Sequence, residues 1–153
     1  PSGSNQKWEV KEDGKLKWDK KNDRVRFVDY LAYPGNYGMI PGTNAGDGDP
    51  VDVIVLGRSS KRGEIVKVRL LGVLEAFDDG EEDNKWIAVY DESELDPIER
   101  ETTGLHKMKS FKELKETYPG IDRIIQTFFE NYKRKNKSKM VMKILGFKER
   151  TEL

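Results

Sequence analysis

The sequence predicts a mainly β protein with flanking helices, of the α+β class, in which two helices from the C-terminal half cover a small β-barrel. Three observations lead to this prediction. The first two-thirds of the 153 residues consist of short apolar or alternating runs separated by Gly, Pro and acidic turns. Helical periodicity appears only later, and many strands followed by a helical pair are typical of a covered barrel. No repeat or low-complexity linker divides the chain, so we expect a single domain over residues 1–153.

The strand-like segments differ in how clearly they are marked. Residues 7–11 and 15–18 alternate around Glu12-Asp13-Gly14, which is the pattern of a β-hairpin. Pro34-Gly35 is the signature of a type II turn, so we expect a tight loop from Tyr33 to Gly38. The other expected strands are residues 24–31, 51–56, 65–77 (as one strand or two), 85–90 and 140–145, the last ended by Gly146.

Two helices are expected between residues 110 and 132. Ser110 is a suitable N-cap with Glu113 at capping-box spacing, so a helix is expected over residues 111–118, ended by Pro119-Gly120. The second helix begins at residue 121, and its apolar residues recur at i, i+3, i+4, i+7, i+8 and i+11, which places them on one face. These residues are Ile121, Ile124, Ile125, Phe128, Phe129 and Tyr132.

Composition excludes several classes of function. The 28 basic residues balance 28 acidic ones, so no bulk field favours nucleic acid or a membrane surface. The chain has no Cys, and its one histidine, His106, excludes a multi-His metal site and is expected in an exposed or interface loop. No apolar run approaches a membrane span and no signal peptide is visible, so a cytoplasmic location is expected. The chain starts at Pro1 without Met, which suggests a truncated N-terminus.

Two acidic clusters stand at the ends of expected strands. The first contains Asp47, Asp49 and Asp52 just at the start of the strand over residues 51–56, and the second covers residues 78–83 before Lys85. Each by itself is compatible with a solvated turn. Two such clusters at one end of a barrel would repel one another unless a cation neutralised them, and Mg²⁺ prefers oxygen ligands of this kind.

Basic and tyrosine residues complement the acidic clusters. Residues 133–139 hold five cations after the second helix, which alone would suit a helix C-terminus, and further cations lie on expected strands at Lys7, Arg24 and Arg26. The hydroxyls of Tyr33 and Tyr37 are uncharged donors suited to phosphate oxygens. Together the motifs indicate a metal-dependent site for a small, highly charged phosphate compound. The chain has no P-loop motif, which argues against a nucleotide site of that type.

The motifs, in their order along the chain, resemble those of the soluble inorganic pyrophosphatases of family I. The resemblance implies an OB-like, five-stranded, closed β-barrel and hydrolysis of pyrophosphate to two phosphates, with several Mg²⁺ ions in each site. It also implies a homo-oligomer, commonly a hexamer. The matching segments are Lys7-Trp8-Glu9, Tyr33-Pro34-Gly35-Asn36-Tyr37-Gly38, Asp47-Gly48-Asp49-Pro50-Val51-Asp52-Val53, Asp78-Asp79 with Asp83 and Lys85, and Phe128-Phe129-Glu130-Asn131-Tyr132-Lys133.

The same resemblance implies roles for individual residues. Asp49 would be the general base, taking a proton from a metal-activated water or hydroxide that acts as nucleophile. The metal ligands would be Asp47, Asp52, Asp78 and Asp83, with Asp79 and Glu9 supporting them through water. The phosphates would be bound by Lys7, Arg26, Tyr37, Lys85, Tyr132 and Lys133, with Tyr33 and Lys139 lining the site less directly.

The sequence also departs from the family pattern and leaves alternatives open. The Glu of a Glu-Ile-Pro segment that the family usually has cannot be placed before Pro1, and Arg24 is the alternative to Arg26. One other function is an OB-like nucleic-acid module using Tyr33, Tyr37, Trp86 and the basic run, although its carboxylates would repel a phosphate backbone. A second is a degenerate pyrophosphatase-like protein with a structural or binding role.

Overall fold

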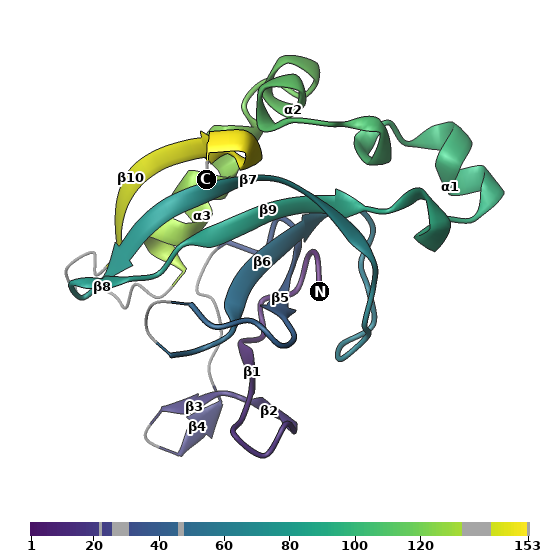
Figure 1. Cartoon of the computed structure of the whole chain (residues 1–153). Helices are drawn as coiled ribbons and strands as arrows, with labels where there is room; N and C mark the ends of the chain where they lie inside the picture. Colours follow the sequence, from purple (N-terminus) through teal and green to yellow (C-terminus); the bar gives the residue numbers. More distant parts are fainter. Residues whose placement is uncertain (22, 26–30, 46–47, 133–141, 153) are drawn as a thin grey trace.

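The structure is a computed structural model, which describes residues 1–21, 23–25, 31–45, 48–132 and 142–152. Its main element is a mixed sheet that curves across the molecule (Figure 1). Five strands follow one another across the sheet, and a short sixth strand, β8 (Glu81–Glu82), pairs with the end of β7. The order is β10 (Met142–Glu149), β7 (Val68–Asp78), β9 (Lys85–Tyr90), β6 (Val51–Leu56) and β5 (Asn36–Ile40).

Strands β6 and β9 form the centre of the sheet and place the first residues of the site. Their sequences, VDVIVL and KWIAVY, are mostly apolar, as expected for strands covered on both faces. They pair in parallel, with Asp52 opposite Lys85, whereas the other neighbours in the sheet are antiparallel. The expected strands over residues 51–56 and 85–90 are confirmed at these bounds.

The N-terminal part forms two small ribbons below the main sheet in Figure 1. The predicted hairpin is confirmed, since β1 (Trp8–Val10) pairs with β2 (Leu16–Trp18) and places Trp8 opposite Trp18. The two indole rings stack with their centroids 5.6 Å apart. The second ribbon joins β3 (Lys20–Lys21) to β4 (Arg24–Val25). Residues 26–30 of the expected strand over 24–31 lie outside the described residues.

Three α-helices are described, two of them predicted: α1 (Pro97–Thr102), α2 (Phe111–Thr117) and α3 (Ile121–Asn131). In α2 the Ser110 hydroxyl accepts from the Glu113 amide at 3.0 Å, but the Glu113 carboxylate accepts from the Lys109 amide, so the box is not reciprocal. The sequence analysis missed α1, although Asp96 and Glu99 make a reciprocal capping box there. The remaining helical turns are the 3₁₀ segments η1 (Glu92–Glu94), η2 (Leu105–Lys107) and η3 (Arg150–Glu152).

Helix α3 supplies several of the largest side chains of the core. Ile125, Phe128 and Phe129 are buried against residues of the sheet, including Ile54, Leu74 and Ile87. Ile124, expected on the same face, is 55 % exposed and thus lies outside the buried stripe. The predicted helix is confirmed, but the predicted apolar face wrongly includes Ile124.

Three expectations, about one strand end, one loop and one turn, are wrong. Gly146 does not stop the last strand, because a bulge between Ile144 and Gly146, where the φ of Gly146 is 137°, lets β10 continue to Glu149. Tyr37 and Gly38 lie in β5 and not in a loop. Gly35 is not among the residues with positive φ, which a type II turn requires there. A glycine is needed at 35 because a Cβ would stand 2.7 Å from Ile54 Cγ1.

A closed barrel requires the two edge strands of the main sheet, β10 and β5, to pair with each other. Among the described residues the strand path is open, running from β10 to β5 without a pairing that joins these two edges. The mainly β class with flanking helices is confirmed, while the closed barrel stays a prediction. No helix in the described part of the chain is long and apolar enough to cross a membrane.

Neighbouring isoleucines of α3 provide a matched test of the packing. Ile125→Ala removes a fully buried side chain and leaves a cavity, so it should lower the free energy of unfolding by about 3 kcal/mol. Ile124→Ala removes the same atoms from a largely exposed position and should change it by less than about 0.5 kcal/mol. Urea unfolding followed by circular dichroism measures both, and equal losses would contradict the described orientation of α3.

Candidate functional site

The centre of the candidate site is a buried ammonium group between two carboxylates. Lys85 begins β9 and is 1 % exposed, yet its Nζ donates to Asp52 Oδ2 at 2.8 Å and to Asp83 Oδ1 at 2.7 Å. The parallel register of β6 and β9 places Asp52 beside Lys85, and Asp83 precedes Lys85 by two residues. Three of the predicted site residues are therefore brought together.

Aromatic rings form the wall behind this cluster. The Lys85 ammonium lies 5.3 Å from the centroid of the Tyr37 ring and 5.7 Å from that of Phe129, distances at which a cation is attracted to an aromatic face. Tyr132, at the end of α3, packs edge-on to both rings, and Tyr33 stacks on Tyr37. Of the predicted tyrosines, Tyr37 therefore contacts the Lys85 ammonium directly, while Tyr33 and Tyr132 pack against Tyr37. Phe129 was missed as a contact of the ammonium because its position in the helical pattern indicates a core residue.

Burial sets the protonation of these groups. It raises the pKa of the Asp52 carboxyl above its ordinary value, and the repulsion from Asp83 adds to this, although attraction to Lys85 opposes it. Burial also raises the pKa of the Tyr37 and Tyr132 hydroxyls well above their usual range, with the charges of Asp52 and Asp83 contributing. Both tyrosines are therefore neutral hydrogen-bond donors throughout the physiological pH range.

The second acidic cluster forms a tight hairpin between β7 and β8. Asp79 and Gly80 have φ values of 52° and 83°, and a two-residue loop with two positive φ angles is the type I′ geometry. Asp78 ends β7 and is partly buried, whereas Asp79 is exposed in the turn. Asp83, with its side chain 14 % exposed, is thus the member of this cluster that reaches Lys85.

The loop before β6 carries the remaining acidic residues of the first cluster. The Ala45 amide donates to the Asp49 carbonyl at 2.7 Å, and the Thr43 hydroxyl accepts from the Val51 amide at 2.9 Å, which fixes the entrance to the strand. Asp49 itself is exposed. Asp47 lies outside the described residues, and no group of three His, Cys, Asp or Glu side chains with metal-binding geometry occurs among those described.

A second buried lysine lies at the N-terminal ribbon. Lys7 is 7 % exposed and its ammonium donates to Glu9 Oε1 at 2.7 Å and to Asp19 Oδ2 at 2.9 Å. Burial works to raise the pKa of the Glu9 carboxyl, but the hydrogen bond from Lys7 and its charge lower that pKa overall. Asp19 was missed by the sequence analysis. Extending the predicted hairpin by one pair would have placed it opposite Lys7, since Trp8 pairs with Trp18.

Two predicted phosphate-binding residues and one residue predicted to line the site less directly cannot be placed. Arg26, Lys133 and Lys139 lie outside the described residues. The alternative to Arg26, Arg24, is exposed in β4.

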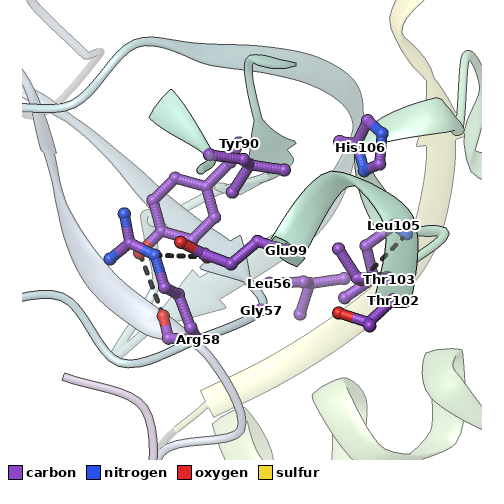
Figure 2. Close-up of a pocket in the computed structure, with 10 residues that line it drawn as sticks. Leu56, Gly57, Arg58, Tyr90, Glu99, Thr102, Thr103, Leu105 and His106 are labelled. Carbon is purple, nitrogen blue, oxygen red and sulfur yellow. Dashed lines mark hydrogen bonds and ion pairs between the residues drawn. The ribbon is translucent and has the colours of Figure 1, made fainter. Parts of the chain in front are cut away.

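A cavity of about 220 Å³ lies elsewhere, at the other end of β6 and β9 (Figure 2). Leu56, Tyr90, Leu105 and His106 line it, and none of the predicted site residues is among the lining residues. His106 is 7 % exposed in η2, so of its two expected places the exposed loop is wrong, while the interface loop stays a prediction. The reason is that the Arg69 guanidinium donates to the His106 carbonyl at 3.2 Å, which holds η2 against β7.

A buried ammonium, two carboxylates and tyrosine hydroxyls meet where β6 and β9 begin, a set of groups whose chemistry suits a protein that binds small phosphate compounds. The sequence model of the family "Inorganic pyrophosphatase" matches residues 1–153. The chain belongs to the inorganic pyrophosphatase family. Members of this family are enzymes. The match of the family model agrees with the resemblance already carried by the motifs.

Individual relatives support the same assignment. An inorganic pyrophosphatase of Nanoarchaeum equitans is 42 % identical over 142 residues, covering 92 % of this chain and 79 % of that protein. An inorganic pyrophosphatase of Thermoplasma volcanium is 37 % identical over 156 residues, covering 99 % of this chain and 82 % of that protein. The crystal structure of inorganic pyrophosphatase from Thermus thermophilus superposes with a TM-score of 0.74 at 35 % identity, covering 99 % of this chain and 79 % of that one.

Removing the central ammonium tests the electrostatics of the site. Lys85→Met leaves Asp52 and Asp83 facing one another without a cation, which should lower the free energy of unfolding at pH 7 by about 2 to 4 kcal/mol. The pKa of Asp52 is already raised in the folded state, so the folded protein binds more protons than the unfolded chain and gains stability as the pH falls.

The loss in Lys85→Met should therefore shrink when unfolding is measured at pH 5 instead of pH 7. Lys148→Met is the matched control, because Lys148 is 47 % exposed and pairs with Glu75 at 3.4 Å on the surface. That change should cost less than about 1 kcal/mol at either pH. A loss in Lys85→Met that grows on acidification would contradict the described cluster.

Proposed function

We propose that this protein hydrolyses pyrophosphate to two phosphates with Mg²⁺, using a water molecule as nucleophile and Asp49 as general base. The observation that carries the proposal is the Asp52–Lys85–Asp83 cluster, in which groups suited to binding metal and phosphate surround a buried ammonium. The membership of the chain in the inorganic pyrophosphatase family supports it as well. Buried charges of this density are costly to a fold and are typical of functional sites.

The donor set fits a divalent cation. The carboxylates of Asp52 and Asp83 both accept hydrogen bonds from the Lys85 ammonium. Their two negative charges therefore stabilise positive charge at this place. Mg²⁺ prefers such oxygen ligands. We assign Asp47, Asp52, Asp78 and Asp83 as its ligands, with Asp79 and Glu9 acting through water. When bound, the metal ions would neutralise the charge of the phosphates and lower the pKa of a bound water.

The chain's own residues would bind the substrate and move the proton. Lys7, Lys85 and the hydroxyls of Tyr37 and Tyr132 would donate to phosphate oxygens, together with Arg26 and Lys133, while Tyr33 and Lys139 would line the site. The raised pKa of both tyrosines supports their role as donors. Asp49 would accept a proton as the water oxygen bonds to phosphorus and the bridging P–O bond breaks, with the second phosphate leaving.

The aromatic residues argue against the nucleic-acid alternative. Tyr33 is 6 % exposed and packs on Tyr37 and Phe128, so its ring is not available to stack on bases. The basic run over residues 133–139 by itself favours no particular partner. The proposal also retains the closed barrel and a homo-oligomer, expected to be a hexamer, as part of the family pattern.

Substituting the proposed base tests the mechanism. Asp49→Asn keeps the shape of the side chain and removes its basicity, so kcat for phosphate release from pyrophosphate with Mg²⁺ should fall at least about 10²-fold. Asp13→Asn, a similar change in the exposed β1–β2 turn, should leave kcat within about twofold. Unchanged turnover in Asp49→Asn would remove this residue from the mechanism, and no turnover in the wild type would refute the proposed function.

Metal binding should be visible in stability without any turnover. If the assigned carboxylates converge on Mg²⁺, a concentration of 100 times Kd should stabilise the fold by about 2.7 kcal/mol. For a chain of this size that corresponds to a rise in Tm of about 5 to 10 °C. Differential scanning fluorimetry with and without MgCl₂ measures it, and Asp52→Asn should reduce the rise. A Tm indifferent to Mg²⁺ would contradict the assigned ligands.

A further inference from the structure

We propose that Asp19 is a positioning residue for Lys7, holding the lysine ammonium inward so that it can bind a phosphate of the substrate. The proposal rests on the proposed function and adds to it a residue that neither the motifs nor the family comparison singled out. Asp19 lies just after β2, and its own side chain is not placed against substrate by any contact described above. It would act through Lys7.

The geometry of the pair carries the first step. The side chains of Lys7 and Asp19 are each 9 % exposed, and their Nζ and Oδ2 atoms are 2.9 Å apart. The Asp19 amide also donates to the Lys7 carbonyl at 2.7 Å, directly beyond the Trp8–Trp18 pair of the hairpin. The backbone hydrogen bond therefore places the two residues opposite one another, independently of the contact between their side chains.

The second step concerns the other partner of Lys7. Glu9 contacts the same ammonium at 2.7 Å, but its side chain is 44 % exposed, whereas that of Asp19 is 9 % exposed. Both carboxylates also face Lys11, Glu9 at 3.3 Å and Asp19 at 3.8 Å, so exposure is what distinguishes them. Without the charge of Asp19, the ammonium would be attracted only toward this exposed carboxylate. A buried ammonium without a buried counter-charge is costly, so Lys7 would move outward.

The same arrangement occurs at Lys85, the other buried lysine among the residues that the structure describes. Lys85 also donates to two carboxylates, from Asp52 and Asp83, at 2.8 and 2.7 Å. There, both carboxylates are assigned to metal ions, so they have a second reason to be present. Asp19 has no such assignment, and its burial against Lys7 is explained if the position of that ammonium is what it secures.

The expected signature is a change in KM with little change in kcat. Asp19→Asn keeps the size of the side chain and an acceptor oxygen but removes the charge that holds Lys7. If Lys7 binds phosphate equally in the ground and transition states, KM for pyrophosphate should rise about tenfold while kcat stays within about threefold. Asp13→Asn in the turn of the same hairpin is the control and should change neither. Asp19→Glu restores the charge and should recover part of the loss in KM.

A double-mutant cycle separates positioning from a general structural effect. In a Lys7→Met background Asp19 has no ammonium to position, so adding Asp19→Asn should raise KM by less than about twofold further. If the two changes multiply instead, or if Asp19→Asn behaves like Asp13→Asn, the proposal is overturned. A fall in kcat at unchanged KM in Asp19→Asn would overturn it as well.

The remaining outcomes are distinguishable. Should Asp19→Asn fail to fold by circular dichroism, Asp19→Glu, which keeps the charge but moves it by one methylene, carries the same test of KM against kcat. In that case the Lys7→Met background decides: a rise in KM caused by Asp19→Glu that persists there unchanged overturns the proposal. Absence of pyrophosphate hydrolysis by the wild type overturns the proposed function and this inference together, whereas hydrolysis with independent effects of Lys7 and Asp19 overturns only the inference.

Discussion

The structure depends most on the ion cluster of Lys85 with Asp52 and Asp83 at the centre of the main sheet. A 1 % exposed ammonium must be neutralised within the protein, and the parallel pairing of β6 with β9 supplies the carboxylate that does so. On the other side of β6, Gly35 allows the chain to approach Ile54 just before β5 begins, because a Cβ there would stand 2.7 Å from Ile54 Cγ1. Charge and packing thus select the same arrangement of strands.

Helix α3 links this cluster to the hydrophobic core. Phe129 is fully buried among core residues and also presents its ring to the Lys85 ammonium, so one side chain serves stability and electrostatics. Tyr132, at the end of the helix, completes the wall, and burial keeps its hydroxyl protonated by raising its pKa. Because these groups are held by the core, they need little reorganisation to meet a charged ligand, which is the property that electrostatic catalysis requires.

The balance of 28 basic and 28 acidic residues has a structural counterpart in local neutralisation. Lys7 and Lys85 are each buried with two carboxylates, so the positive groups suited to phosphate are accompanied by negative groups. Such clusters carry a net negative charge at close range, and this charge favours a divalent cation over a long anionic partner. A neutral chain is therefore compatible with a strongly charged site.

The sequence by itself determined the β6 and β9 strands, the β1–β2 hairpin, the helix after Gly120 and the family, because periodicity, turn residues and contiguous motifs are local properties. It also identified Asp52, Asp83, Lys85, Tyr37 and Tyr132 as site candidates. Only the tertiary structure decided that Asp19 faces Lys7, that His106 is buried, that Gly146 continues a strand and that Ile124 is exposed. These depend on which surfaces meet across the fold, and strand register, bulges and helix rotation are chosen by packing between segments far apart in the chain.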